Sequence, residues 1–499
     1  MVMKRFVFFA MAGLACGTGT MMSAEVSVPH LLSNHMVVQR SQPVHVWGRG
    51  AVGEHVVVSF RQAQQATVAD ELGNWSVTLP PGLAGGPFTM EIAGSNKITL
   101  QDVLVGDVWV ASGQSNMEFE MWKLAHPDEE IAAVNDPEMR LLQVKRQPST
   151  YPRYDTDMTE WAAATPATVK DFSAVAYYFA REIRSREHVP VGVIESSWGG
   201  TVADAWTSLG TLSRDASLMP VFAARALMIE GEERNRQMQA FEQTATAEAK
   251  AAGRPAPEFP WHPALESWAP GDLYNGMIAP LTGFGIRGVI WYQGESNSAP
   301  GRAPIYDRVF PTMISDWRER WREGDFPFLF VQIANFKSGP LEDWPTVRDA
   351  QRRTLALKNT GMAVTIDIGN PDNVHPVDKV DVGLRLSLAA RAIAYGEHVE
   401  YSGPLFREAD REGSSLRARF DHVTGGLVVK GKELEGFEVA GVAGEFVPAV
   451  ARVEGDSIVV SSDRVVRPVR VRYAWTNSPA CTLFNGAGLP ASPFLGSAR

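Results

Sequence analysis

Cysteine is scarce in this sequence, with only Cys16 and Cys481 among its 499 residues. If Cys16 is removed with an export signal, no disulfide can form within the chain, even in an oxidising compartment. No set of cysteines and histidines has the spacing of a zinc site. These absences exclude a disulfide scaffold, and we expect neither a metal nor another cofactor.

The sequence also has fewer basic than acidic residues, and it has few long apolar runs. The sequence has 47 Lys and Arg against 57 Asp and Glu, a formal net charge of -10, which argues against nucleic acid or an anionic membrane as a partner. No apolar run after residue 25 is long enough to cross a bilayer. The overall amino-acid composition is ordinary for a globular protein, and the length predicts roughly two to four domains.

The first 24 residues have a composition of their own. Lys4 and Arg5 precede the apolar run FVFFAMAGLACG, and small residues follow as far as Ala24. This pattern is typical of a signal peptide, so we expect residues 1–24 to be removed and the protein to be periplasmic or secreted. A lipid anchor at Cys16 is the alternative, although GLAC lacks the branched apolar residue that usually stands three positions before such a cysteine.

Three further regions follow along the chain. Residues 25–101 and 401–499 consist of short β-branched runs separated by Gly, Pro and Asn, which is typical of small antiparallel sandwiches. Between them, in residues 102–400, longer apolar strands alternate with amphipathic helices, a pattern that predicts a parallel α/β sheet. Residues from about 209 to 270 are charged, helical and then Pro-rich, and we interpret them as an insertion. The predicted fold class is therefore α/β, with a helix-flanked parallel sheet and a small β-sandwich-like domain at each end.

The central strands are continuous apolar runs, as strands covered on both faces should be. They are predicted at DVWVAS, RLLQVK, PVGVIESS, GVIWYQG, FPFLFVQIA and AVTIDIG, and helices are predicted over residues 171–184 and 381–396. In open α/β sheets, ligands bind beyond the carboxyl ends of the strands. The residues that directly follow each strand are therefore the candidates for chemistry.

Ser115 follows the first of these strands in the stretch GQSNM. A serine at a helix start is a common N-cap, and it is also well placed as a nucleophile over a sheet edge. After the third strand, Gly199 and Gly200 allow a close backbone approach, so that one N–H can face a developing oxyanion. An ordinary strand-to-helix turn is the alternative there.

The fourth strand ends in the polar cluster Gln293-Gly294-Glu295-Ser296-Asn297. A buried strand rarely ends in so many hydrogen-bonding groups without a use for them. The alternative is a capped loop in which Glu295 pairs with an arginine.

The last strand is followed by DNVHPVDK, in which Asp372 and His375 stand three residues apart. This spacing lets the carboxylate orient the imidazole as a general base. Asp367 and Asp378 are alternative partners. Taken together, a nucleophile, a base, its orienter and oxyanion donors follow four strands of one sheet, in the chain order Ser, Asp, His.

These stretches resemble the sialate O-acetylesterase family of the SGNH hydrolase superfamily. The resemblance rests on VWVASGQSNM, on WGGT followed by AW, on LYNGMIAPL and IRGVIWYQGESN, on DNVHPVDKVDVGLRL, and on the ending VRYAWTNSPACTLFNGAGLPASPF. It implies a metal-free serine esterase that hydrolyses acetyl esters on sugars, with Ser115 as nucleophile, His375 as general base and acid, and Asp372 as its orienter.

The resemblance further implies that the N–H groups of Ser115 and Gly200 line the oxyanion hole. The wider superfamily has a Gly-x-Asn block, whereas here Ser296 stands two residues after Gly294. The side-chain donor is then Gln293 or Asn297, and the sequence does not decide between them.

The substrate implied is an O-acetylated sialic acid or an acetylated polysaccharide such as xylan. Side chains expected to contact it are Gln114, Asn116, Trp206, Asn275, Glu295 and Arg385, together with Trp261 and Trp268. A non-catalytic carbohydrate-binding protein and a peptidase are the competing hypotheses.

Overall fold

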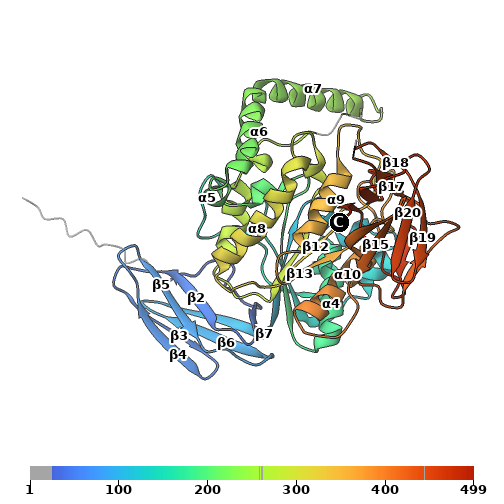
Figure 1. Ribbon diagram of the computed structural model, residues 1–499. Helices are drawn as coiled ribbons and strands as arrows, with labels where there is room; N and C mark the ends of the chain where they lie inside the picture. The colour runs from blue at the N-terminus through green and yellow to red at the C-terminus, as the bar shows by residue number, and fades with distance from the viewer. Residues whose placement is uncertain (1–24, 258, 260–261, 443) are drawn as a thin grey trace, which may run out of the picture.

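The computed structural model describes residues 25–257, 259, 262–442 and 444–499 (Figure 1). The expected signal peptide with Cys16, and Trp261, lie outside the described residues. The chain folds around a central sheet, with β strands gathered at both ends of the described sequence (Figure 1).

The central sheet has the strand order β13-β12-β11-β7-β10-β8-β9. Its strands are β7 (Lys97–Gly113), β8 (Asp136–Gln143), β9 (Ala162–Ala164), β10 (Val191–Ser197), β11 (Gly288–Tyr292), β12 (Phe328–Val331) and β13 (Thr360–Ala363). All neighbouring pairs are parallel except β8 and β9. Every residue of β10 to β13 is buried, which is why these strands read as continuous apolar runs. The predicted parallel α/β fold is confirmed.

Helices cover both faces of this sheet. On one face, α4 (Ala174–Glu187) packs against α10 (Val380–Ile393), and the Phe179 ring lies 4.9 Å from that of Trp109. On the other face, Trp291 of β11 contacts Trp317 of α8 (Tyr306–Trp321) at 5.8 Å, and α9 (Trp344–Thr354) lies beside α8. Short helices α1 (Ser115–Glu118), α2 (Pro127–Ala132) and α3 (Pro166–Val169) complete this region.

The N-terminal β region is continuous with the central sheet. It contains β1 (Val37–Gln39), β2 (Val44–Arg49), β3 (His55–Phe60), β4 (Ala63–Val68), β5 (Asn74–Leu79) and β6 (Gly85–Ala93). β6 pairs with the first half of β7, whose second half enters the parallel sheet. The predicted boundary after residue 101 therefore falls inside one strand, and the division into domains stays a prediction.

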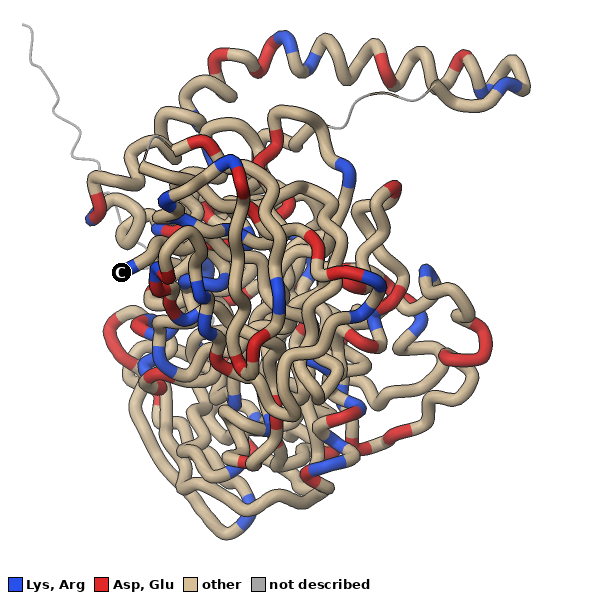
Figure 2. Tube along the Cα trace, turned by 45° about the vertical axis from the view of Figure 1, so that its right-hand side comes forward, with Lys and Arg blue, Asp and Glu red and all other residues tan. Residues whose placement is uncertain are grey.

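The insertion is helical, as its sequence indicates. It forms α5 (Leu209–Leu212), α6 (Met219–Glu230) and α7 (Glu232–Ala251). Helix α7 projects from the body of the molecule, and Ala249 is its one buried residue (Figure 1). Basic and acidic residues are interspersed along it and over the rest of the trace (Figure 2).

The C-terminal region holds two four-stranded sheets and a two-stranded one. They are formed by β14 (Leu405–Glu412), β15 (Ser415–Asp421), β20 (Ser457–Ser461) and β19 (Val450–Glu454); by β18 (Phe446–Pro448), β17 (Phe437–Ala440), β21 (Arg470–Tyr473) and β23 (Phe494–Ser497); and by β16 (Leu427–Val429) with β22 (Leu483–Asn485). The fully buried Arg348 of α9 donates to the carbonyl oxygens of Thr476 and Asn477, each at 2.8 Å. These bonds fix the C-terminal sheets to the α/β core. Among the described residues, no helix combines the length and apolarity needed to cross a bilayer.

Candidate active site

Ser115 and His375 meet at the carboxyl edge of the central sheet. β7 ends at Gly113, where φ is +136° and a Cβ would lie 2.2 Å from the Tyr292 carbonyl oxygen, so only glycine allows this turn. Ser115 is the first residue of α1, and its Oγ lies 2.8 Å from Nε2 of His375. Both residues line a cleft of about 360 Å³ whose other walls are Glu118, Phe119, Glu120, Lys123, Asn373 and Val377.

The surroundings of His375 keep its imidazole neutral. Burial, assisted by the charges of Lys379 and Lys123 and opposed by Glu120, lowers the pKa of His375 to about 4. A neutral imidazole within hydrogen-bonding distance of a hydroxyl can accept its proton. This pair therefore has the geometry and the protonation state that activate a serine.

Asp372 does not contact the imidazole. Its carboxylate is 81% exposed and lies 3.2 Å from Nζ of Lys337. The turn places Asn373 instead of Asp372 toward the base, since Asn373 Oδ1 accepts the backbone N–H of His375 at 2.9 Å. The expected orienting bond from Asp372 is thus missing from this structure.

The two alternative aspartates have other partners as well. Asp367 forms a bidentate ion pair with Arg385, and Oδ1 of Asp378 accepts the N–H of Asp381. Among the described residues, no carboxylate is hydrogen-bonded to the His375 imidazole.

Gly199 lies against the nucleophile, and Gly200 follows it in the chain. A Cβ on Gly199 would be 3.2 Å from that of Ser115, and the Gly199 N–H donates to Glu118 at 2.9 Å. Gly200 has φ +75°, its carbonyl accepts the Trp268 indole N–H at 2.6 Å, and its own N–H has no acceptor among the described residues. The N–H of Ser115, at the first position of α1, has no intrahelical partner either. The backbone N–H groups of Ser115 and of Gly200 are therefore both free to donate.

Gln293 and Asn297, the two candidate side-chain donors, differ in how their amides are used. The Gln293 NH₂ donates to Asn297 Oδ1 at 2.6 Å and to the Thr201 carbonyl, and its Oε1 accepts the Tyr306 hydroxyl. Asn297 Oδ1 also accepts the Ala203 N–H at 2.9 Å, whereas its own NH₂ is buried without a partner. Gln293 is thus fully engaged, and Asn297 holds a fixed, unused donor.

Asn116 is hydrogen-bonded to the segments that carry the site. Its NH₂ donates to Glu295 at 2.6 Å and to the carbonyl of Val374, the residue before His375. Its Oδ1 accepts the ammonium of Lys379, a fully buried side chain, at 2.6 Å. Burial lowers the pKa of Lys379 to about 7 and raises the pKa of Glu295. The nucleophile helix, the Glu295 turn and the histidine loop are therefore connected through one amide.

Several predicted substrate contacts serve the fold. Trp206 is fully buried, Trp268 is 7% exposed, and the Asn275 NH₂ holds the loop at Ser149 with a 3.0 Å bond. Arg385 is occupied by Asp367. Correcting the expectation from sequence, these four side chains lie outside the cleft lining, because each is used in packing or in an internal bond.

Gln114, Asn116 and Glu295 lie beside the nucleophile but are engaged internally. Gln114 Oε1 accepts the N–H groups of Gly294 and Ser296 at 3.4 and 3.2 Å. They support the site and do not line the cleft.

Sequence reasoning missed Glu118 and Lys379. Glu118 stands three residues after Ser115, a spacing that places both on one face of a helix. Lys379 precedes the apolar stripe of α10, and its burial has no signature in the sequence.

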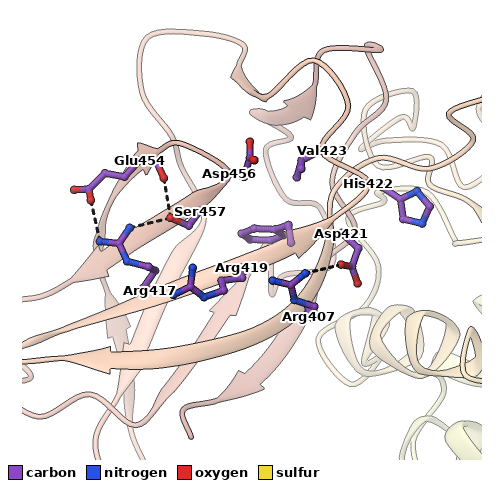
Figure 3. Close-up of a pocket in the computed structure, with 10 residues that line it drawn as sticks. Arg407, Arg417, Arg419, Asp421, His422, Val423, Glu454, Asp456 and Ser457 are labelled. Carbon is purple, nitrogen blue, oxygen red and sulfur yellow. Dashed lines mark hydrogen bonds and ion pairs between the residues drawn. The ribbon is translucent and has the colours of Figure 1, made fainter.

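A second cavity, of about 610 Å³, lies on the C-terminal sheet and is lined by Arg407, Arg417 and Arg419 (Figure 3). Arg407 pairs with Asp421 at 3.1 Å and Arg417 with Glu454 at 3.0 Å, so these guanidinium groups are neutralised. Within the described part of the chain, no cluster of three or more His, Cys, Asp or Glu is arranged to hold a metal ion. The cleft at Ser115 is therefore the candidate active site.

The chain is similar in sequence and in structure to known proteins. A family model described as carbohydrate esterase, sialic acid-specific acetylesterase, matches residues 263–394. The sialate O-acetylesterase of Homo sapiens is 30% identical over 518 residues, covering 93% of this chain and 91% of the relative, and that of Mus musculus is 29% identical over 522 residues, covering 93% of each. A solved carbohydrate acetylesterase from Xanthomonas citri is 38% identical, with a TM-score of 0.82 over 94% of this chain and 99% of its own. This chain belongs to the sialate O-acetylesterase family and is a carboxylic ester hydrolase.

Proposed function

We propose that the protein is a serine esterase that removes O-acetyl groups from a carbohydrate. The observation that carries the proposal is the 2.8 Å separation between Ser115 Oγ and His375 Nε2 in an open cleft. The family supports an acetyl ester on a sugar as the substrate, since its members are named for sialic acid and for carbohydrate acetates.

Acylation begins when Ser115 Oγ attacks the acetyl carbonyl carbon and His375 Nε2 takes the hydroxyl proton. The tetrahedral intermediate collapses, the bond between the carbonyl carbon and the sugar oxygen breaks, and His375 returns the proton to that oxygen. Water, deprotonated by His375, then attacks the acetyl carbonyl carbon, the bond from that carbon to Ser115 Oγ breaks, and acetate leaves as His375 returns the proton to Oγ. The same imidazole thus serves as base and acid in both halves of the reaction.

We assign three hydrogen-bond donors to the oxyanion hole. They are the N–H groups of Ser115 and Gly200 and the NH₂ of Asn297. The unpartnered state of the Asn297 NH₂ and of the Gly200 N–H supports this assignment. Fixed donors that need no reorientation stabilise charge as it develops. Gln293 acts as a positioning residue, because its bond to Oδ1 sets the direction of the Asn297 amide.

The test is Ser115→Ala, which should abolish p-nitrophenyl acetate hydrolysis while circular dichroism shows an unchanged fold. The wild type should also be labelled by a fluorophosphonate probe, which a purely sugar-binding protein would not be. Unchanged turnover in the variant would refute the assignment. Casein assayed in parallel tests the peptidase alternative, which no feature of the described residues favours.

We also propose that residues 1–24 direct export. The support is their composition, a basic start followed by a short apolar run. Mass spectrometry of the protein recovered from the periplasm or medium should give an N-terminus at Glu25. A mass that retains a lipid-modified Cys16 would favour the anchored alternative.

A further inference from the structure

Two tryptophans lie beside ion pairs that include residues lining the candidate active-site cleft. Glu120 pairs with Lys123, whose Nζ lies 5.1 Å from the centre of the Trp122 ring. We call these three residues the Trp122 cluster. Both Glu120 and Lys123 line the cleft that contains Ser115 and His375. Trp122 itself does not line the cleft, and its indole lies next to the lining residue Lys123, at the rim.

Glu118, which also lines the cleft, pairs with Arg146, whose guanidinium lies 5.9 Å from the centre of the Trp198 ring. We call these three residues the Trp198 cluster. Glu118 also accepts the N–H of Gly199, and this bond connects the Trp198 cluster to the loop beside the nucleophile. Trp198 is half-buried and packs against the core. Its replacement would disturb Gly199 and Gly200, so Trp198 is a poor residue to test.

The Trp122 ring is unusually accessible. It is 47% exposed, and it is the one tryptophan among the exposed large apolar side chains of the described residues. Its backbone is nevertheless fixed, because the Trp122 N–H donates to the Lys170 carbonyl and the adjacent Met121 is fully buried. A rigid, exposed indole beside a polar cleft offers a flat apolar face with hydrogen-bonding groups at its edge, a combination typical of ligand and partner recognition.

The charges of the two clusters balance. Glu118 and Glu120 are matched by Arg146 and Lys123, so the clusters do not add a net charge to the rim. A ligand of either sign would have to break one of these pairs, whereas neutral hydroxyl groups can hydrogen-bond to all four side chains. A pyranose ring fits this chemistry, because its C–H faces are apolar and its edge carries hydroxyls.

We infer that the Trp122 cluster binds a sugar ring adjacent to the acetylated one, and hence that the substrate is an O-acetylated oligosaccharide of at least two rings. This inference rests on the proposed function for the position of the acetylated ring. With the acetyl group at Ser115, the first ring occupies the cleft, and the next ring stacks on the exposed indole at the rim.

The test compares Trp122→Ala and Trp122→Phe with the wild type on three kinds of substrate. These are p-nitrophenyl acetate, free O-acetylated sialic acid, and two oligosaccharides, acetylated xylohexaose and O-acetylated sialyllactose. Phe241→Ala on α7, where the replaced ring is 66% exposed, is the matched control for loss of a surface aromatic. The two oligosaccharides distinguish a plant-type glycan from a sialoglycan.

For Trp122→Ala we expect kcat/KM to fall roughly tenfold on the better oligosaccharide, through KM, with no change on the two single-unit substrates. Trp122→Phe should recover most of the loss. Equal loss on p-nitrophenyl acetate, equal loss on free sialic acid, or no loss on either oligosaccharide would each overturn the inference.

A binding measurement separates this inference from the proposed function. Calorimetric titration of Ser115→Ala with the oligosaccharides should show weaker binding when Trp122→Ala is added. If the wild type hydrolyses none of the esters but this difference persists, the proposed function fails and the sugar subsite stands. If esters are hydrolysed and the difference is absent, the subsite fails alone.

Discussion

The side-chain amide of Gln293 donates to Oδ1 of Asn297 across 2.6 Å, which fixes the Asn297 amide with its NH₂ as the free end. A second donor, the Ala203 N–H, reaches the same oxygen at 2.9 Å. Of the two candidates that the sequence left for the side-chain oxyanion donor, we therefore propose Asn297. Ser296, at the spacing where the wider superfamily has asparagine, contributes only its backbone N–H to Gln114.

Asn297→Ala should therefore lower kcat by about 100-fold, a loss of about 3 kcal/mol of transition-state stabilisation, because one fixed oxyanion donor is removed. KM should change little, since the donor acts on the charge that develops during the reaction. Steady-state kinetics on p-nitrophenyl acetate measure both constants.

Ser296→Ala is the matched control and should keep wild-type kcat, because the replaced hydroxyl has no partner in the hydrogen-bond network. If Ser296→Ala proved as damaging as Asn297→Ala, the assignment of the side-chain donor would be wrong.

Asp372→Asn should cost less than about tenfold in kcat/KM. Its carboxylate is 81% exposed and pairs with Lys337, which is 67% exposed, and exposed ion pairs of this kind contribute only about 0–1 kcal/mol. In serine hydrolases where an aspartate orients the histidine, the same substitution costs on the order of 10⁴ in kcat. Parallel assays of Asp372→Asn and His375→Gln distinguish the two situations. A collapse of both variants to the same residual rate would show that Asp372 turns toward the imidazole during catalysis.

The positions of the site residues along the chain follow from the sequence, but their contacts do not. Continuous apolar runs mark the buried parallel strands, and chemistry-bearing residues such as Ser115 and His375 stand just after them. The spacing of Asp372 and His375 fits an orienting bond, yet a turn can place either Asp372 or Asn373 toward the base. Which amide stays free in the Gln293 cluster depends on Thr201, Ala203 and Tyr306, whose proximity no local pattern reveals.

The last predicted strand of the central sheet shows a similar limit of prediction from sequence. AVTIDIG is predicted as a strand, but β13 ends at Ala363 and the buried residues after it lie in a loop. There the Val364 carbonyl accepts a bond from Arg385, and the Thr365 hydroxyl donates to the Gln332 carbonyl. These bonds between a side chain and a backbone carbonyl take the place of the backbone bonds of a strand pair, so an apolar run alone does not identify a strand.

The pH profile of kcat/KM should have its acid limb near pH 4. His375 must be neutral to accept the serine proton, and its pKa in the folded protein is lowered to about 4. Activity is therefore present above that pKa and is lost as the pH falls through it. Rates measured from pH 3 to 8, with each sample assayed again at pH 7 to exclude unfolding, give the position of the limb.

Lys379→Met should move this limb upward by about one pH unit, because a nearby positive charge that disfavours the imidazolium is removed. The other charged groups that act on His375, Lys123 and Glu120, are unchanged in this variant. Lys337→Met, at an exposed lysine, is the control and should leave the limb in place. A limb that stays near pH 4 in Lys379→Met would contradict the electrostatic account.

Glu195→Gln should stabilise the protein at alkaline pH. Glu195, on β10, is 2% exposed, and burial raises its pKa to about 8, with the charge of Glu118 acting in the same direction. Because the folded pKa lies above the unfolded value, the folded state holds the proton more tightly. The protonated side chain therefore supports folding fully below about pH 4.5, and this contribution is lost as the pH rises through about 8.

A glutamine keeps the neutral shape of the protonated glutamate at every pH, so its oxygen can still accept the Ser197 hydroxyl. Urea unfolding should therefore show nearly equal stability of variant and wild type at pH 5 and an advantage of roughly 2–4 kcal/mol for the variant at pH 9. Glu71→Gln, at an exposed position, should show no such divergence. Parallel pH dependences of Glu195→Gln and wild type would mean that Glu195 is ionised in the folded protein, because only an ionised carboxylate would contribute no proton linkage over this range.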